Sequence, residues 1–383
     1  MRALYSSYDT IIVDNAYKEW FIQPLHLKNL KGKTIYFQEG VVLKALKGKF
    51  TNKNAALITL ENAVDVSLIG NGTIFMMNKA EYLDGEWRHG LSIRESKNIS
   101  IKGFIIKDSG GDGIYIAGKN KGTYSENIYI EDVQCINNKR QGMSIISAQN
   151  VVVSNCMFME TNGTLPEAGL DIEPNSPADR IVNINFKDCS FINNSHSGIL
   201  IALGKLETSS LPVSISFNSC YLSNNHVISN IYPAAEININ ANKESPVRGR
   251  VSFEECLVEN SKWGMLFSRK RSDAFDVVFK NCAAINICKS WGYSPLGFEV
   301  PDYRTIYSSL GGFAFDNLFL SYKLSVPVIK VRGSKLGTLK SFKNVTGNLI
   351  IKNNGTKGIE YVNYFSVQNE NVKLNFTYLK GED

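Results

Sequence analysis

Short runs in which every second residue is apolar recur along the chain, and five of them contain a glycine just before the first apolar position. They are Arg88–Ile93, Gly111–Ile116, Arg140–Ile145, Glu167–Ile172 and His196–Ile201. Their shared glycines, Gly90, Gly113, Gly142, Gly169 and Gly198, are 23, 29, 27 and 29 residues apart. Self-similarity at this spacing is typical of repeat proteins in which equivalent segments stack on one another.

A second alternating run follows each glycine run, as in Asn98–Ile101 and Asn127–Ile130, and then a segment that starts with cysteine, as in Cys189–Asn194. Alternation in branched residues, separated by Asn, Gly and Ser, predicts short half-buried strands joined by turns. Three such strands per repeat predict an all-β chain that forms a single-stranded right-handed parallel β-helix, with coils ~4.8 Å apart. No sustained 3.6-residue periodicity is present, which argues against a solenoid of helices.

The repeats divide the chain into three parts. Residues 1–30 precede the clear repeats and are expected to form an N-terminal cap, because an open solenoid end exposes unpaired strand edges. Residues 31–330 are expected to form the β-helix itself. Residues 331–383 remain strand-like with irregular spacing, so they are the last coils or a C-terminal β cap.

Composition fits one elongated domain, with 383 residues of which 43% are hydrophobic. No apolar run approaches ~18 residues, so we expect no membrane span. The first ten residues lack the apolar core of a signal peptide, which predicts either a cytoplasmic protein or a trimmed form of an exported one. The net charge of +6 is spread along the chain apart from Arg269–Arg271, which permits an acidic substrate and gives little reason to expect nucleic acid.

The seven cysteines fit the repeat better than a redox or metal site. Cys156, Cys189, Cys220, Cys256 and Cys282 start equivalent segments, and Cys135 is expected to start the same segment one coil earlier. There is no C-x-x-C pair and no His/Cys cluster at zinc spacing. We therefore expect a buried column of free thiols and no metal site.

The candidate chemistry lies on the outer side of the glycine strands. If the residues one and three after the glycine point inward, those two before, two after and four after share the outer face. In the fourth repeat these positions hold three candidate catalytic acids, Glu167, Asp171 and Glu173. Glycoside hydrolysis uses two carboxyl groups in unequal environments, and this group could provide them.

Neighbouring repeats add candidate substrate-binding residues of several chemical types. They are Trp87, Arg88, His89, Asp112, Tyr115, Arg140, Gln141 and His196. Asp112 and Gln141 directly precede their glycines, where a turn role is the alternative. The alternative for the whole group is an ion-paired surface that only keeps the coil soluble.

Four segments carry a family resemblance: Glu86–Gly90, Ser109–Ile114, Arg140–Gly142 and Ala168–Asn175. They resemble bacterial right-handed parallel β-helix repeat proteins of the pectate-lyase-like superfamily, and in particular a glycosidase-like group. The resemblance implies action on a polysaccharide or oligosaccharide along the outside of the coil, and a periplasmic or extracellular location. The paired aspartates and Gly-His-Gly of polygalacturonases, the Arg-x-Pro-x-x-Arg of pectate lyases and the Asp-Pro-His-Glu of alginate epimerases are absent.

Three hypotheses follow. The first is a glycoside hydrolase that needs no cofactor. The second is a lyase or epimerase on an acidic glycan, in which His196, Tyr115 or an arginine removes a proton and calcium is a possible cofactor. The third is a non-catalytic glycan-binding module. The sequence indicates neither the sugar nor the oligomeric state.

Overall fold

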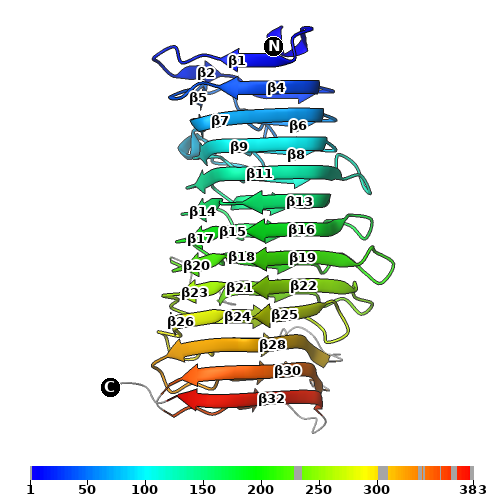
Figure 1. The fold of residues 1–383 in the computed structure, drawn as a ribbon, viewed down its shortest axis with the longest axis vertical. Helices are drawn as coiled ribbons and strands as arrows, with labels where there is room; N and C mark the ends of the chain where they lie inside the picture. Colours follow the sequence, from blue (N-terminus) through cyan, green and yellow to red (C-terminus); the bar gives the residue numbers. More distant parts are fainter. Residues whose placement is uncertain are drawn as a thin grey trace.

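The computed structural model describes residues 2–227, 235–300, 309–334, 339, 341–353, 355–363 and 369–379. In this part of the chain the strands are arranged as stacked coils of a right-handed parallel β-helix, with β1 at one end of the stack and β32 at the other (Figure 1). The predicted fold class is confirmed. The helical elements of the described residues are two single-turn 3-10 helices, η1 (Ala3–Tyr5) and η2 (Lys79–Glu81), and neither has the length to cross a membrane.

The 12-stranded sheet forms one wall of the solenoid and carries the glycine strands. Its strands are β3 (Leu25–Lys28), β6 (Ile58–Glu61), β8 (Leu91–Arg94), β10 (Ile114–Ala117), β12 (Gln141–Ile145), β15 (Ala168–Ile172), β18 (Ile199–Ala202), β21 (Ala235–Asn240), β24 (Gly264–Ser268), β27 (Leu296–Glu299), β29 (Ile329–Arg332) and β31 (Ile359–Val362).

The 20-stranded sheet forms the rest of the coil wall. One series of its strands is β1 (Thr10–Val13), β4 (Lys31–Phe37), β7 (Val64–Met76), β9 (Lys97–Lys107), β11 (Ser125–Ile136), β13 (Ala148–Ser154), β16 (Ile181–Lys187), β19 (Val213–Asn218), β22 (Gly249–Glu254), β25 (Asp276–Lys280), β28 (Ser309–Tyr322), β30 (Ser341–Lys352) and β32 (Glu370–Leu379). The other is β2 (Trp20–Ile22), β5 (Val42–Ala45), β14 (Met157–Met159), β17 (Ser190–Ile192), β20 (Tyr221–Ser223), β23 (Leu257–Glu259) and β26 (Ala283–Ile287). Long strands such as β7 pair with members of both series, which joins them into one sheet.

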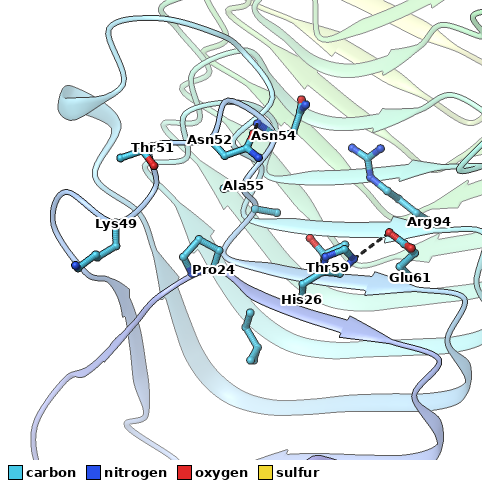
Figure 2. A pocket seen from close by; sticks show the side chains of 12 residues that line it. Pro24, His26, Lys49, Thr51, Asn52, Asn54, Ala55, Thr59, Glu61 and Arg94 are labelled. Carbon is cyan, nitrogen blue, oxygen red and sulfur yellow. Dashed lines mark hydrogen bonds and ion pairs between the residues drawn. The ribbon is translucent and has the colours of Figure 1, made fainter.

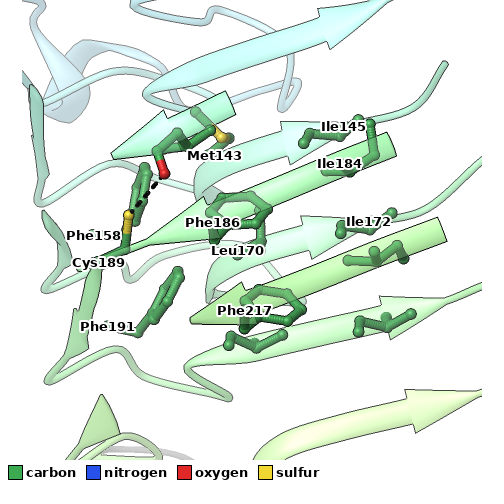
Figure 3. Packing of buried hydrophobic residues seen from close by; sticks show 14 of the residues in the cluster. Met143, Ile145, Phe158, Leu170, Ile172, Ile184, Phe186, Cys189, Phe191 and Phe217 are labelled. Carbon is green, nitrogen blue, oxygen red and sulfur yellow. Dashed lines mark hydrogen bonds between the residues drawn. The ribbon is translucent and has the colours of Figure 1, made fainter. Parts of the chain in front are cut away.

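The interior is filled by like residues stacked on like residues. The rings of Phe186, Phe217, Phe253 and Phe279 are parallel, with centroids 5.0, 4.7 and 4.6 Å apart. Figure 3 shows this packing around Phe158, Phe186, Phe191 and Phe217. Burying aromatic rings at native density stabilises the coil, and the parallel register repeats the contact in each coil.

The seven cysteines are free and buried, as predicted. The position of Cys135 was predicted wrongly, because it pairs with Phe158, and the backbone amide of Val133 contacts Cys156 Sγ at 3.4 Å. Cys135 therefore lies two residues beyond the column that contains Cys156. Both positions point inward because they differ by two residues on one strand.

The ends of the chain also take part in the stack. β1, β2 and β3 pair in parallel with β4, β5 and β6, so residues 10–28 make a coil where we expected a separate cap. Their alternation is weak in the sequence because this coil has a neighbour on one side only, and exposed apolar residues such as Phe21 interrupt the pattern. Near the other end, β30, β31 and β32 continue the parallel pairing within the described residues.

Candidate functional site

Polar side chains from three adjacent strands of the 12-stranded sheet meet in one cluster. In the parallel register Tyr115 of β10 pairs with Ser144 of β12, which pairs with Asp171 of β15. Their side chains share one face at intervals of ~4.8 Å, because equivalent positions stack in parallel coils. Carboxyl groups gather beside this column, and we call Glu86, Asp112, Asp171 and Glu173, with Arg140, the carboxyl cluster.

Arg140 lies between three of these acids. Its Nη1 is 3.8 Å from Asp112 Oδ1, its Nη2 is 3.6 Å from Glu173 Oε2, and its Nε is 3.6 Å from Glu86 Oε2. The surrounding carboxyl groups raise the pKa of Arg140 against the opposing effect of its burial. One guanidinium therefore holds acids from a loop and from two different coils around a single point.

Asp171 is fully buried at the bottom of the cluster. Its Oδ2 accepts a hydrogen bond of 2.9 Å from Gln141 Nε2, and Gln141 is fixed in turn because its Oε1 accepts the Ala168 amide at 2.8 Å. Burial raises the pKa of Asp171 well above its usual range, and the charge of Glu173 and hydrogen bonding to it raise that pKa further. Asp171 therefore retains its proton in the folded protein at pH values where an exposed aspartate is ionised.

Glu173 is the member of this pair that reaches the surface, with 44% of its side chain exposed. It follows β15 at a turn that is fixed by Asp179, whose Oδ2 accepts the amides of Asn175 and Ser176 at 2.8 Å each. The arrangement places an accessible carboxyl group next to a buried one that holds a proton. Such a pair can deliver a proton to a bound molecule.

Asp112 and His89 form the opposite side of the cluster, and both are fully buried. Burial raises the pKa of Asp112 to about 7, while Arg140 acts against this shift. His89 Nδ1 accepts the Asp112 amide at 3.1 Å, and its ring stacks on Tyr115 with centroids 4.4 Å apart. Burial, together with Arg94 and Arg140, lowers the pKa of His89, so the imidazole is neutral and its Nε2 carries the proton.

Buried polar atoms without a hydrogen-bond partner among the described residues are concentrated here. They are His89 Nε2, Asp112 Oδ1 and Oδ2, Arg140 Nε, Ser144 Oγ and Asp171 Oδ1. Those of Asp112 and Arg140 are in ion-pair contact at 3.4 to 3.8 Å, which is too long for a hydrogen bond. Buried polar atoms in folded proteins are normally paired, so a concentration of unpaired ones calls for water or a ligand that satisfies them. Donors and acceptors are both present, which suits the hydroxyl groups of a sugar.

Arg88, Glu167 and His196 were predicted as site residues but make their contacts outside the cluster. Arg88 is buried, and its guanidinium donates to the carbonyls of Phe50 at 2.7 Å and Thr51 at 3.2 Å. Glu167 Oε1 accepts the Gly163 amide at 2.7 Å, and its charge acts on Lys79. His196 packs on His226 with ring centroids 4.3 Å apart, and burial lowers its pKa to about 4.

Two of the three misplaced residues, Arg88 and Glu167, share a structural cause at the repeated glycine, whereas Arg140 at the same position still reaches the cluster. A Cβ on Gly142 would lie 2.9 Å from Phe158 Cβ, in the interior, and the next residue, Met143, is also buried. Alternation is therefore interrupted at the glycine, and the residue directly before it reaches the outer face. This brings His89, Asp112 and Gln141 into the site, whereas Arg88 and Glu167 turn into the loops beside it.

Trp87 was predicted as a site residue, and three further residues near the cluster were not. Trp87 remains 42% exposed. Glu86, Ser144 and Arg94 were not predicted, although Ser144 and Arg94 occupy the outward positions two and four after their glycines. Glu86 lies on a loop, where strand periodicity gives no signal. In the described part of the chain, no group of three or more His, Cys, Asp or Glu side chains is arranged to hold a metal ion.

One known family matches the central coils of the chain. Residues 58–243 match the family described as the right handed beta helix region. The protein YclG of Bacillus subtilis (strain 168) is 29% identical over 126 residues, which are 30% of this chain and 22% of YclG. The SPbeta prophage-derived protein YorA of the same strain is 26% identical over 172 residues, 41% of this chain and 27% of YorA. The matched region thus spans about a quarter of the length of these relatives.

Two solved structures share the fold along nearly the whole chain. The catalytic unit of the GH87 α-1,3-glucanase of Streptomyces thermodiastaticus strain HF3-3 has a TM-score of 0.58 at 12% identity, covering 98% of this chain and 63% of that one. The family 28 exopolygalacturonase of Yersinia enterocolitica has a TM-score of 0.57 at 11% identity, covering 100% of this chain and 75% of that one. The resemblance to the pectate-lyase-like β-helix proteins is confirmed at the level of the fold.

Proposed function

We propose that this protein is a glycoside hydrolase that binds a polysaccharide or oligosaccharide across the 12-stranded sheet at the carboxyl cluster. The observation that carries the proposal is the concentration of buried polar atoms without a hydrogen bond around Asp112 and Asp171, two carboxyl groups whose pKa values are raised by burial. A surface that only keeps the coil soluble would have no need of such atoms. The two structural relatives, by their names a glucanase and a polygalacturonase, are in keeping with this proposal.

Two accessible carboxyl groups, each 3.6 Å from a nitrogen of Arg140, take the two roles in hydrolysis. Glu173 gives the proton to the glycosidic oxygen, and the protonated Asp171 behind it supplies the pair with that proton. Glu86, with 32% of its side chain exposed, is the carboxylate that accepts a proton from the attacking water. Hydrolysis needs one acid and one carboxylate in different environments, and here both carboxyl groups lie beside Arg140.

The test is analysis of the products from a panel of glycans, with wild type beside Asp171→Asn. We expect new reducing ends without an ultraviolet-absorbing unsaturated sugar, and a loss of roughly 100-fold or more in kcat in the variant, the scale of general acid catalysis. An unsaturated product would show elimination and contradict the proposal. Full activity in a folded Asp171→Asn would remove this residue from the mechanism.

A non-catalytic glycan-binding module is the second candidate, and one observation favours it. Asp112, Asp171 and His89 are fully buried, so the accessible chemistry depends on Glu86, Arg140 and Glu173. Binding of a glycan at this sheet with no turnover across the panel would establish this candidate in place of the hydrolase.

A further inference from the structure

A pocket of about 450 Å³ lies on the same sheet as the carboxyl cluster, nearer the amino-terminal end of the chain. Figure 2 shows His26, Thr59, Glu61 and Arg94 along its floor and the segment from Lys49 to Ala55 at its side. The floor residues come from the adjacent strands β3, β6 and β8. A volume of this size is within the range of small-ligand sites.

The wall of the pocket is fixed by Arg88, which the sequence pattern predicted to bind substrate. Arg88 donates to the carbonyls of Phe50 and Thr51, and its Nη1 donates to the Asp84 carbonyl at 2.5 Å. It thereby ties the segment around Phe50 to the loop that carries Glu86. The pocket and the carboxyl cluster are thus bordered by loops that are joined to each other.

The pocket carries an excess of positive charge. Its lining contains one carboxylate, Glu61, which is within 2.9 Å of His26, 2.9 Å of Lys119 and 3.7 Å of Lys28. Lys49 and Arg94 also line it, and neither forms an ion pair with another described residue. Glu61 is therefore already neutralised, and two cations remain available to a ligand.

Arg94 is held in place so that it can meet such a ligand. Its Nε donates to Ser92 Oγ at 3.0 Å, and its guanidinium carbon lies 4.9 Å from the centre of the Tyr115 ring. These contacts leave the two terminal amino groups, which together bind carboxylate or sulfate oxygens well. Tyr115 stacks on His89, so Arg94 is also next to the carboxyl cluster.

The neutral part of the lining fits a sugar. Thr51, Asn52, Asn54 and Thr59 offer hydroxyl and amide groups that can donate and accept hydrogen bonds. From Ser92 beside Arg94, the register runs through Tyr115 and Ser144 to Asp171, three steps of ~4.8 Å. A glycan that reaches the cluster can therefore extend into the pocket.

From these observations we infer that the pocket is a subsite for a sugar residue that carries an anionic group, either a uronate carboxylate or a sulfate ester. Arg94 and Lys49 bind the anion, and the threonines and asparagines bind the hydroxyl groups. The inference rests on the proposed function in that the same glycan spans the pocket and the carboxyl cluster.

Binding is measured by calorimetry with the whole chain carrying Glu173→Gln, in which we expect turnover to be slowed roughly 100-fold or more. The probes are an oligogalacturonate, a sulfated oligogalactan and a neutral oligoglucan of equal length. We expect Arg94→Gln to weaken binding of at least one anionic probe by roughly 10-fold, the scale of a hydrogen bond to a charged group, and to leave the neutral probe unchanged. Lys49→Gln changes an exposed side chain and leaves the fold intact, and we expect it to weaken binding of the same probe. Arg250→Gln, exposed on β22 of the other sheet, is the matched control with no effect.

The two anionic probes distinguish the carboxylate from the sulfate. Equal affinity for the neutral and both anionic probes, or unchanged anionic affinity in folded Arg94→Gln and Lys49→Gln, would overturn the subsite. Because the measurement is of binding, Arg94-dependent binding in a protein without hydrolytic activity would retain the subsite and refute the hydrolase. Hydrolysis of a neutral glycan by wild type, with Arg94→Gln fully active, would retain the hydrolase and refute the subsite.

Discussion

Arg88 and Arg140 occupy equivalent positions, two residues before a repeated glycine, and have different roles. Arg88 is 3% exposed and is bonded mainly to backbone carbonyls of two loops, whereas Arg140 faces carboxyl groups from three segments. The partners, which come from distant parts of the sequence, decide the difference. Arg88 contributes to stability, and Arg140 positions the acids of the candidate site.

This contrast predicts that Arg88→Met destabilises the protein. Removal of the guanidinium leaves the Phe50 and Thr51 carbonyls without their donor and frees the pocket wall. We expect a loss of about 3 kcal/mol in the free energy of unfolding, measured by urea denaturation. Arg248→Met, at an exposed arginine, is the control, and equal stability of the two variants would contradict this role for Arg88.

Glu236 is a second residue whose surroundings decide its behaviour. Its neighbour Ile237 pairs with Ile199, so Glu236 occupies the position that Gly198 has in the preceding coil. It is fully buried, and its carboxyl oxygens accept from the backbone amide of Asn225 at 3.2 Å and from its side-chain amide at 2.5 Å. Burial raises the pKa of Glu236 to about 7.

The raised pKa predicts a stability that depends on pH. Because the folded protein holds the proton more tightly than the unfolded chain, the contribution of Glu236 is fully present below pH 4.5 and is lost as the pH rises through about 7. Between these limits wild type should lose about 3 kcal/mol relative to Glu236→Gln, at roughly 1.4 kcal/mol per unit of pKa. Urea denaturation at several pH values measures this. Parallel pH profiles for wild type, Glu236→Gln and the exposed control Glu244→Gln would refute it.

The sequence predicted part of the candidate site because strand register places outward residues in columns. Tyr115, Arg140 and Asp171 were found in this way. His89, Asp112 and Gln141, directly before their glycines, were included without a geometric reason. The interrupted alternation seen at Gly142 provides that reason. Glu86 could not be predicted as an acid of the cluster, since a loop residue comes close to Arg140 only through the path of the folded chain.

At the scale of elements, a ladder of one aspartate and four asparagines fixes one bend in each of five successive coils. Asn98 donates to Asp65, Asn127 to Asn98, Asn150 to Asn127 and Asn183 to Asn150, at 2.7 to 3.0 Å. All five residues have φ between 54° and 56°. Asn and Asp tolerate this left-handed conformation better than most residues, so each contributes both a backbone bend and a link to the next coil.

The two contributions can be separated at Asn127. Asn127→Gly keeps the left-handed conformation and loses the ladder, so we expect a cost of about 1 kcal/mol. Asn127→Ala also adds the strain of a left-handed alanine, for a total of about 2 to 3 kcal/mol. Urea denaturation of the two variants measures the difference. Equal stability of the glycine and alanine variants would show that the backbone conformation adds nothing.

The sequence predicted the elements well where both faces of a coil are packed, and less well at the edges. The alternation around Ile99, Ile128 and Ile184 corresponds to observed strands because each lies between two coils. The strands of residues 10–28 lack a coil on one side, so fewer of their apolar residues are buried and the repeat is harder to recognise. Register within a repeat was also uncertain, and Cys135 was misplaced by two residues because that shift preserves the inward side.

At the scale of the whole molecule, the two sheets present different surfaces. On the 20-stranded sheet, charged residues form exposed pairs such as Lys97 with Glu126 and Lys102 with Glu131, at 2.9 and 2.8 Å. Such pairs contribute little to stability. The 12-stranded sheet carries buried acids, unpaired polar atoms and the basic pocket on one face. A long glycan bound along this face would meet Glu86, Arg140 and Glu173 at the surface of the carboxyl cluster and the residues of the basic pocket.

The most direct test of the account compares two glutamates of the same coil. Glu173 belongs to the carboxyl cluster, whereas Glu167 bonds to the Gly163 amide in a neighbouring loop. The measurement is the rate at which Glu173→Gln and Glu167→Gln release reducing ends from the glycan that wild type cleaves. We predict a loss of roughly 100-fold or more in kcat for Glu173→Gln and nearly full activity for Glu167→Gln. Full activity in Glu173→Gln, or equal losses in two folded variants, would contradict the central claim that the carboxyl cluster is the catalytic site.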